Sequence, residues 1–370
     1  MPVQRGARPA SPPSSALFPS PSRDPLLHRL EAVAPDTQSG FADHIREWRF
    51  PQGDFLRDGF TPQHGCVWDF TIVRHDGLYH LIHIDGRLGA SCYAPGNLIS
   101  FGHSSTPDFV TWTTHQAALA STPGTWDESH VWAPYVFKDR RLGRWVMLYT
   151  GLNRFDCQQI GVAYSSDLLT WTKEAANPVF RPAYVDWLQY ALSTGSACRD
   201  PHVRVEGAEY VLYTTIAARD GRVGVAGCVS HDLVTWDRPW PVYLTTFGTS
   251  VPRQVESPAV HRDREQDRYL LFYTQNTGTH VVVGDNSRDF MGREPKMIWE
   301  TVAAVEVVAR LPGRWLVAGY RQRSYDGAYR LFLGSLDLDA LVVREIHDSA
   351  ALMPFLEAAQ EARPTEESER

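Results

Sequence analysis

Long apolar runs are missing from this 370-residue chain, and no stretch approaches the ~20 consecutive apolar residues of a membrane-spanning helix. The opening residues, rich in Pro, Ser and Arg, also lack the continuous apolar core of a signal peptide. We therefore expect a disordered tail over residues 1–45, with one short helix near residues 26–33. The same absences predict a cytoplasmic protein without a membrane partner.

Cysteine is scarce and follows no pattern. The odd number of cysteines includes no Cys-x-x-Cys pair, so their spacing fits neither a zinc site nor a disulfide framework; they are Cys66, Cys92, Cys157, Cys198 and Cys228. Asp-rich calcium loops of the EF-hand type are absent as well. The sequence thus predicts buried free thiols, no metal site and no cofactor.

Positive charge is in deficit. The chain has 36 Lys and Arg against 43 Asp and Glu, and no basic stripe with interleaved aromatics. This balance argues against nucleic acid and anionic membranes as partners. Aromatics, by contrast, are abundant: 12 Trp and 15 Tyr can both fill a core and line a carbohydrate site. The expected partner is a carbohydrate substrate, and the oligomeric state stays open.

The middle of the chain lacks any long segment with helical periodicity. Short apolar or alternating runs, separated by Gly, Pro, Asn and Asp, predict antiparallel strands joined by turns. Five such units recur, each with a strand around one aromatic: Tyr79, Trp145, Tyr210, Tyr269 and Trp315. Units of this length suit the four-stranded blades of a propeller. We predict an all-β fold, a single five-bladed β-propeller over residues 46–355, followed by a polar C-terminal tail over residues 356–370.

A second signature follows the first three aromatics. It is an Asp followed four positions later by a Trp, as in Asp108 to Trp112, Asp167 to Trp171 and Asp232 to Trp236. We expect the Asp to cap a turn and the Trp to pack between neighbouring blades. This signature therefore has a structural role.

Three carboxylates stand near the start of the first strand of their units. Asp69, Asp200 and Glu256 precede the unit aromatics by 10 to 13 residues. Each acid alone is more often structural, but three in register are hard to obtain by chance. Glu306 of the fifth unit falls one position late and is expected to face the other side of its sheet. In a propeller the three acids converge on the central channel, and converging carboxylates are what cleavage of a glycosidic bond needs.

The order of the motifs resembles that of the five-bladed propeller glycosidases, namely glycoside hydrolase families 32, 68 and 43. Residues 101–112 and 159–179 resemble the ends of the first two blades in family 32, and Arg199-Asp200-Pro201 resembles its Arg-Asp-Pro motif. Trp132-Ala133-Pro134 is closer to family 43, and Glu256-Ser257-Pro258 lies between the Glu-Cys and Glu-Gly-Pro of the two families. The resemblance covers roughly residues 60–345.

The resemblance implies a role for each acid. Asp69 would be the nucleophile, as in family 32, or the general base, as in family 43. Asp200 would stabilise the transition state, Glu256 would be the general acid/base, and Arg199 would bind sugar hydroxyls.

Three further residues are candidates for substrate binding. Trp68 and Trp132 could stack on sugar faces, although blade packing is an equal alternative, and His103 of the Gly-His motif could touch the site or make a structural hydrogen bond. Family 43 also leaves open a single ion in the central channel. Because the family 32 Asn-Asp-Pro-Asn is absent around Asp69, we keep the substrate broad, a furanoside or pentoside (a fructoside, arabinoside or xyloside).

Several functions remain open from the sequence. The first is a glycoside hydrolase, with a slight preference for retention of configuration. A sugar-binding pseudoenzyme, or a glycosyltransferase or phosphorylase on the same scaffold, are the alternatives. A WD-type interaction propeller is disfavoured, because WD repeats run ~40–45 residues with adjacent Trp and Asp.

Overall fold

The computed structural model describes residues 55–62, 65–183, 185–191, 197–245, 255–275, 278–322 and 328–361. The expected N-terminal tail, its short helix near residues 26–33, and the last nine residues lie outside this part of the chain. Within it, no helix is long and apolar enough to cross a membrane.

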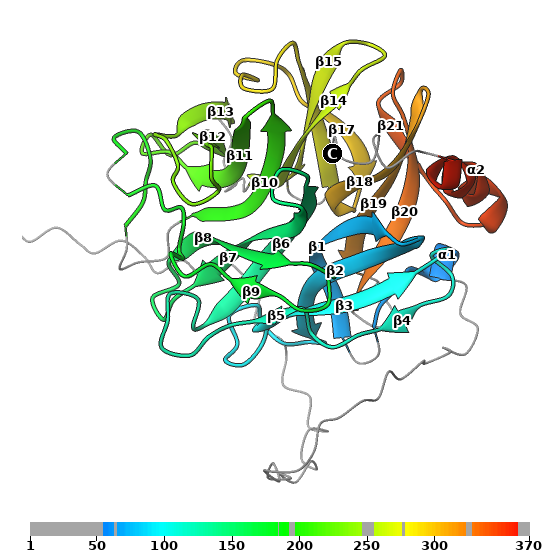
Figure 1. Cartoon of the computed structure of the whole chain (residues 1–370). Coiled ribbons are helices and arrows are strands. Elements are labelled where there is room, and N and C mark those ends of the chain that lie inside the picture. The colour runs from blue at the N-terminus through cyan, green and yellow to red at the C-terminus, as the bar shows by residue number, and fades with distance from the viewer. Residues whose placement is uncertain are drawn as a thin grey trace, which may run out of the picture. The chain divides into compact units, whose positions relative to one another are not determined.

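Five antiparallel sheets, one for each repeat predicted from the sequence, are arranged as the blades of a propeller (Figure 1). The sequence prediction of an all-β, five-bladed propeller with four-stranded blades is therefore confirmed. Blade 1 contains β1 (Gly65–His75), β2 (Leu78–Arg87), β3 (Ser100–Thr106) and β4 (Thr113–Thr114), and β5 (Leu119–Ala120) also pairs with β3. Blade 2 contains β6 (His130–Asp139), β7 (Arg144–Leu152), β8 (Gln158–Ser165) and β9 (Thr172–Lys173).

The remaining three blades follow the same order, and each is contiguous in the chain. Blade 3 contains β10 (Cys198–Glu206), β11 (Glu209–Ala217), β12 (Val223–Ser230) and β13 (Trp240–Leu244). Blade 4 contains β14 (Val255–Asp263), β15 (Arg268–Gln275), β16 (Gly278–Gly284) and β17 (Lys296–Glu300). Blade 5 contains β18 (Ala303–Leu311), β19 (Arg314–Gln322), β20 (Tyr329–Asp337) and β21 (Val342–Glu345).

The first strand of every blade carries the same β-bulge. In each, two unpaired residues on the first strand oppose one residue on the second strand, as in Trp68 and Asp69 between the paired residues Val67 and Phe70. The other bulge pairs are Ala133–Pro134, Asp200–Pro201, Ser257–Pro258 and Ala304–Val305. In blades 2 to 5 the first bulge residue has a positive φ between 48° and 57°, which bends the strand. Trp68 of blade 1 is not among the residues with positive φ.

At each junction between blades, one buried residue of the connecting segment pairs with a strand of the preceding blade. Before the chain enters a new blade, it pairs with the third strand of the preceding blade at an equivalent position, through Leu119, Phe180, Tyr243 and Trp299. Blade 5 has no following blade, but Phe60, just before blade 1, pairs with Leu331 of β20 through two backbone hydrogen bonds of 2.9 and 2.8 Å. Phe60 therefore makes, at the closing junction between blades 5 and 1, the buried pairing that the inter-blade connections make at the other four junctions.

The Asp-x-x-x-Trp signature has the predicted structural role. Asp108 Oδ1 accepts hydrogen bonds from the backbone N–H groups of Val110 and Thr111 at 2.9 and 2.7 Å, and the indole N–H of Trp112 donates to the carbonyl oxygen of Phe109. The equivalent bonds recur around Asp167 and Asp232. The three tryptophans pack against the clusters between blades 5 and 1, 1 and 2, and 2 and 3.

Two helices cover the closing junction. α1 (Phe55–Asp58) and α2 (Ser349–Glu361) contribute Leu56, Leu352, Phe355 and Leu356 to the apolar cluster between blades 5 and 1. The sequence placed a loose tail from residue 356 onward, which is wrong for residues 356–361. Helix α2 continues there because Leu356 is buried in the cluster, and Asp348 caps its first turn through the N–H of Ala351.

Candidate active site

The five bulges surround a central cavity of about 350 Å³, counting space open to solvent, and all five first strands line it. Asp69 and Asp200 belong to this lining, and Glu256 stands next to it, immediately before the bulge residue Ser257. The convergence of the three acids predicted from the sequence is therefore observed.

The acids are not in register, however, and this corrects the sequence analysis. Relative to the bulge, Glu256 occupies the last paired position, Asp200 the first bulge position and Asp69 the second. Glu306 occupies the next position, the first paired residue after the bulge of blade 5. Four acids thus take four successive positions of one repeated motif.

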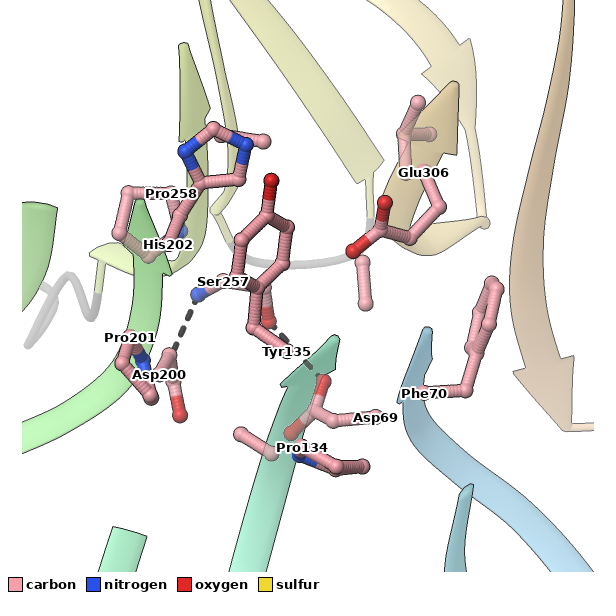
Figure 2. A pocket seen from close by; sticks show the side chains of 14 residues that line it. Asp69, Phe70, Pro134, Tyr135, Asp200, Pro201, His202, Ser257, Pro258 and Glu306 are labelled. Atoms are coloured by element: carbon pink, nitrogen blue, oxygen red, sulfur yellow. Dashed lines mark hydrogen bonds between the residues drawn. The ribbon is translucent and has the colours of Figure 1, made fainter. Parts of the chain in front are cut away.

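Glu306 was expected to face away from the channel, and the structure places it in the cavity lining instead (Figure 2). The expectation failed because the bulge changes the alternation of sides along the strand. His202 occupies the equivalent position in blade 3, the first paired residue after the bulge, and also lines the cavity. These two side chains offer lone pairs to the channel, and the question of a channel ion, which the resemblance to family 43 leaves open, stays open.

Ser257 links two of the three acids (Figure 2). Its hydroxyl donates to Asp69 Oδ1 at 3.0 Å, and its backbone N–H donates to Asp200 Oδ2 at 2.9 Å. The positive φ of 50° at Ser257 is part of the geometry that turns both donors towards the cavity. A hydroxyl and an amide at hydrogen-bond distance hold the two carboxylates at a fixed separation.

Arg199 links Asp200 to the third acid, Glu256. Its guanidinium donates to Glu256 Oε1 at 3.0 Å, and its Nε lies 3.5 Å from Asp200 Oδ2. The side chains of Arg199 and Asp200 are only 12% and 5% exposed, whereas that of Glu256 is 38% exposed. Glu256 is therefore the acid that a ligand entering from solvent can reach directly.

The electrostatics of the group favour retention of a proton. Burial raises the pKa of Asp69 to about 8, and the negative charges of Asp200 and Glu256 act in the same direction. Burial also raises the pKa of Asp200, although Arg199 opposes that change. Asp69 in the free site therefore keeps its proton near neutral pH.

Sequence reasoning missed Tyr320, which is close enough to the three acids for their charges to affect it. Burial raises the pKa of the Tyr320 phenol, and the charges of Asp69, Glu256 and Asp200 add to this effect. A signal for it exists in the repeat. Five positions after the unit aromatic, blades 2, 3 and 4 have Thr150, Thr215 and Thr274, each hydrogen-bonded to a neighbouring bulge residue. Tyr320 occupies this position in blade 5, and its phenol interacts electrostatically with Asp69 of blade 1.

The two predicted stacking residues have unpartnered indole groups. The Nε1 atoms of Trp68 and Trp132 are buried and have no hydrogen-bond partner among the described residues. The Trp132 ring packs edge-on against Tyr93 at 5.4 Å, and the Tyr93 side chain is largely exposed. Trp68 contacts Tyr329 at 4.9 Å between ring centroids. Both tryptophans therefore combine blade packing with a free donor.

His103, the remaining predicted binding residue, lies elsewhere. It is on β3, outside the cavity lining, and its Nε2 is 3.0 Å from Nδ1 of His80. It pairs with Ile82, whose side chain belongs to the cluster between blades 1 and 2. The Gly-His motif thus directs the imidazole to an inter-blade interface and away from the channel.

Comparison with known proteins adds a family to this geometry. The sequence profile described as "Glycosyl hydrolases family 32 N-terminal domain" matches residues 60–267. "Beta-fructofuranosidase, insoluble isoenzyme 7" of Oryza sativa subsp. indica is 27% identical over 217 residues, which cover 55% of this chain and 32% of that protein. "Fructan 6-exohydrolase" of Triticum aestivum is 32% identical over 183 residues, covering 44% and 27%. The chain spans about a third of the length of the curated relatives it matches.

Solved structures agree on the fold. A thermostable family-43 glycoside hydrolase superposes with a TM-score of 0.60 at 15% identity, covering 76% of this chain and 93% of that one. An exo-inulinase from Aspergillus awamori superposes with a TM-score of 0.56 at 19% identity, covering 78% and 65%. At these identities the likeness supports the propeller architecture alone.

Proposed function

We propose that the chain cleaves the glycosidic bond of a furanoside or pentoside. It belongs to the glycosyl hydrolases of family 32, because the profile of that family's N-terminal domain matches more than half of the chain. The observation that carries this proposal is the convergence of Asp69, Asp200 and Glu256 on one cavity, with Ser257 and Arg199 joining them. Glycosidic cleavage by a pair of carboxylates needs one protonated and one ionised member.

Glu256 is the general acid in this proposal. Its side chain is 38% exposed, against 5% for Asp200, and it protonates the oxygen of the departing group. The cluster retains a proton near neutral pH, because the pKa of Asp69 is raised to about 8 in the free site. The reactive form has that proton on Glu256. Neutral Glu256 no longer repels the charge on Asp69, so protonation of Glu256 favours ionisation of Asp69.

Asp69 then acts on the anomeric carbon while Asp200 stabilises the positive charge that develops on the sugar. The Ser257 hydroxyl donates to Asp69 and stabilises its ionised form. We favour attack by Asp69 to form a glycosyl-enzyme, which water then hydrolyses with net retention. Such enzymes hold the two carboxyls about 5–5.5 Å apart, against about 6.5–9.5 Å where Asp69 would instead activate water.

A fructoside is the first choice of substrate, because the curated relatives are named as a fructofuranosidase and a fructan exohydrolase. An arabinoside is the second choice. The exposed ring of Tyr93, which packs against Trp132, supplies a face on which a sugar can stack.

The test is a release assay of the purified full chain against sucrose, short fructans, aryl arabinofuranosides and aryl xylosides. Wild type, Asp69→Asn and Glu256→Gln are compared with Asp76→Asn, an exposed acid of the same blade. We expect turnover on one sugar class, its loss in the first two variants, and its persistence in the third. Full activity of Glu256→Gln on that sugar would overturn the assignment of the acid.

A sugar-binding pseudoenzyme is the second candidate, and the bulge of blade 1 supports it. Trp68 and Asp69 replace the family pattern there, and burial holds a proton on Asp69. This candidate predicts calorimetric binding of a sugar with no turnover. Transfer to another sugar or to phosphate is a variant of the first proposal, and product analysis with added phosphate distinguishes it from hydrolysis.

A further inference from the structure

Three histidines of blade 1 meet at a place that the active site does not use. They are His80 on β2, His103 on β3, and His115 immediately after β4. Each offers a ring nitrogen, and the three nitrogens all lie within 4.8 Å of one another. His80 and His103 are buried, and His115 is partly exposed, so the group has an opening to solvent.

The contacts within this His80–His103–His115 cluster are close. His80 Nδ1 and His103 Nε2 are 3.0 Å apart, and the rings of His103 and His115 are 4.6 Å apart between centroids. Zinc–imidazole bonds of ~2.0–2.1 Å in tetrahedral geometry place ligand nitrogens roughly 3.4 Å apart. Only small side-chain rotations would bring the three nitrogens to that spacing.

The repeat shows that these histidines are a departure from the blade pattern. His80 directly follows the unit aromatic Tyr79, and the residues at that position in the other blades are all aliphatic and fully or almost fully buried: Val146, Val211, Leu270 and Leu316. The strand pairing places Val162, Gly227, Val281 and Leu333 at the position of His103. Blade 1 therefore gives up two apolar positions of its interface with blade 2.

Burying imidazoles among aliphatic side chains is unfavourable unless their nitrogens are satisfied. His103 Nδ1 is buried and has no hydrogen-bond partner among the described residues. The contact between His80 and His103 uses only one nitrogen of each ring. The hydrogen bonds of the protein alone therefore leave this cluster incomplete.

The surroundings keep the rings in the form that binds metal. Burial lowers the pKa of His80 to about 4 and lowers that of His103 to about 2, so both imidazoles are neutral. The Ser105 hydroxyl lies 2.8 Å from His115 Nε2 and can orient that ring, as groups behind a metal ligand do. Backbone pairing fixes the three carriers: His80 opposite Ser105, and the N–H of His115 bonded to the carbonyl of His103 at 2.9 Å.

We propose that His80, His103 and His115 bind one divalent transition-metal ion, of which zinc is the most suited, and that this ion pins the outer strands of blade 1. Three neutral imidazoles on a rigid sheet are a donor set for zinc, cobalt, nickel or copper. A fourth position remains for water on the side where His115 meets solvent. The three histidines lie outside the cavity lining that contains the carboxylates, so we assign the ion a structural function.

The experiment uses the tag-free full chain, stripped with a chelator and titrated with zinc chloride alone by calorimetry. Cobalt(II) provides a second readout, because tetrahedral cobalt absorbs in the visible. The test variant is His80→Val combined with His103→Val, which gives blade 1 residues that its sister blades carry and so should preserve the fold. His231→Gln, an exposed histidine of blade 3, is the matched control.

We expect wild type and His231→Gln to bind one zinc at this site, with a rise in melting temperature and a visible cobalt spectrum. The double valine variant should lose that equivalent of metal, with affinity reduced more than about 100-fold. If it fails to fold, His115→Gln, at the solvent edge, replaces it and should weaken binding in the same way. Equal stoichiometry and affinity in wild type and variant, or no zinc bound by wild type at micromolar concentrations, would overturn the proposal and leave a purely hydrogen-bonded cluster.

Discussion

Blade 1 and the four blades that follow it share one architecture but use it differently. Blades 2 to 5 begin their bulge with a residue at positive φ, and each has a buried aliphatic residue directly after the unit aromatic of its second strand. Blade 1 has Trp68 and Asp69 at its bulge, and His80 directly after its unit aromatic. The four sister blades therefore show what the scaffold requires, and the departures of blade 1 show where chemistry has been added.

Substitutions of Glu256 and Glu306 test whether acids at different positions of the bulge motif have different catalytic roles. We expect Glu256→Gln to reduce kcat by about 10³-fold, because a general acid contributes roughly 10²–10⁴-fold. Glu306→Gln, three positions further along the same motif relative to the bulge, should reduce it less than about tenfold. Steady-state kinetics on the responsive substrate measures both. Equal losses would mean that position within the bulge does not divide the roles.

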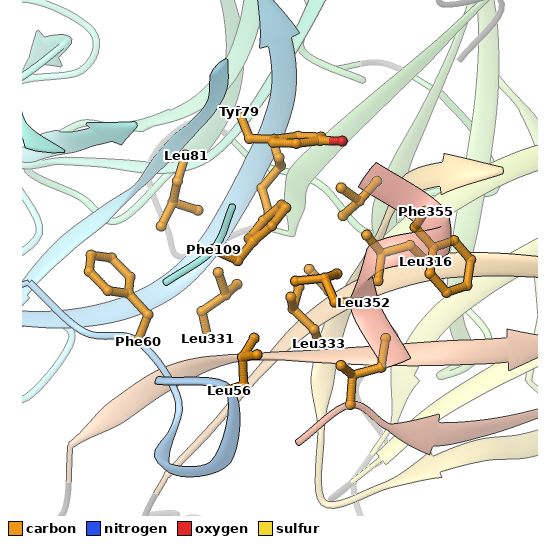
Figure 3. Close-up of a cluster of buried hydrophobic side chains, with 14 of the residues drawn as sticks. Leu56, Phe60, Tyr79, Leu81, Phe109, Leu316, Leu331, Leu333, Leu352 and Phe355 are labelled. Atoms are coloured by element: carbon orange, nitrogen blue, oxygen red, sulfur yellow. The ribbon is translucent and has the colours of Figure 1, made fainter. Parts of the chain in front are cut away.

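Phe60 tests whether the closing junction differs from the internal ones. Phe60 stacks on Trp112 at 3.8 Å and pairs with Leu331, which lies beside it in the apolar cluster (Figure 3). Phe60→Ala should cost about 3 kcal/mol of unfolding free energy in a urea titration, since it removes a buried aromatic. Phe180→Ala, at the equivalent position between blades 2 and 3, should cost less, because the chain itself connects those blades. Equal costs would show that closure has no special dependence on Phe60.

Asp69 tests the electrostatic cost of placing an acid in the bulge of blade 1. Because folding raises its pKa from 3.8 to about 8, the carboxyl favours the folded state at low pH, and that contribution is lost as pH rises towards 8. Asp69→Asn should therefore gain about 1–3 kcal/mol relative to wild type at pH 9, with little gain at pH 4. Melting temperatures across this range give the answer, and Asp76→Asn serves as the exposed control. A gain independent of pH would contradict the raised pKa.

Ser257 tests whether the sister blade supports the acid of blade 1. Ser257→Ala removes the hydroxyl that donates to Asp69 but keeps the backbone N–H bond to Asp200. We expect kcat/KM to fall about tenfold, close to the value of one hydrogen bond to a charged group. The acidic limb of the pH–rate profile should move upward, because ionised Asp69 loses a donor. An unchanged profile would assign Ser257 to packing alone.

Much of the fold was predictable because short sequence patterns that determine local structure recur in the blades. The aromatic of each second strand and the Asp-x-x-x-Trp turn recur along the chain, and hydrogen bonds between side chains and the backbone two or three residues away explain the turn. Helix α2 was missed beyond residue 356 because Pro354 and the polar ending suggest no helix, whereas burial of Phe355 and Leu356 stabilises one. Tertiary packing decided that element.

The site was predictable only to the level of its acids. Counting residues back from an aromatic cannot resolve a one-residue offset, so the stagger of Glu256, Asp200 and Asp69 was invisible. The role of Ser257 depends on where its N–H and hydroxyl point, which a backbone bulge determines. The histidine cluster joins residues on two strands and a third segment, and no spacing in the sequence marks that meeting.

The pairing of Phe60 with Leu331 also has a consequence for how the protein folds. Because every blade is contiguous, each of the four internal junctions can form as soon as its second blade has been synthesised. Phe60 leaves the ribosome first, yet its partner belongs to the last blade, and contacts so distant along the chain form slowly. Ring closure is thus a late event. Until it occurs, the face of blade 1 that carries Ile72 and Leu81 remains uncovered, and nascent chains can associate through it.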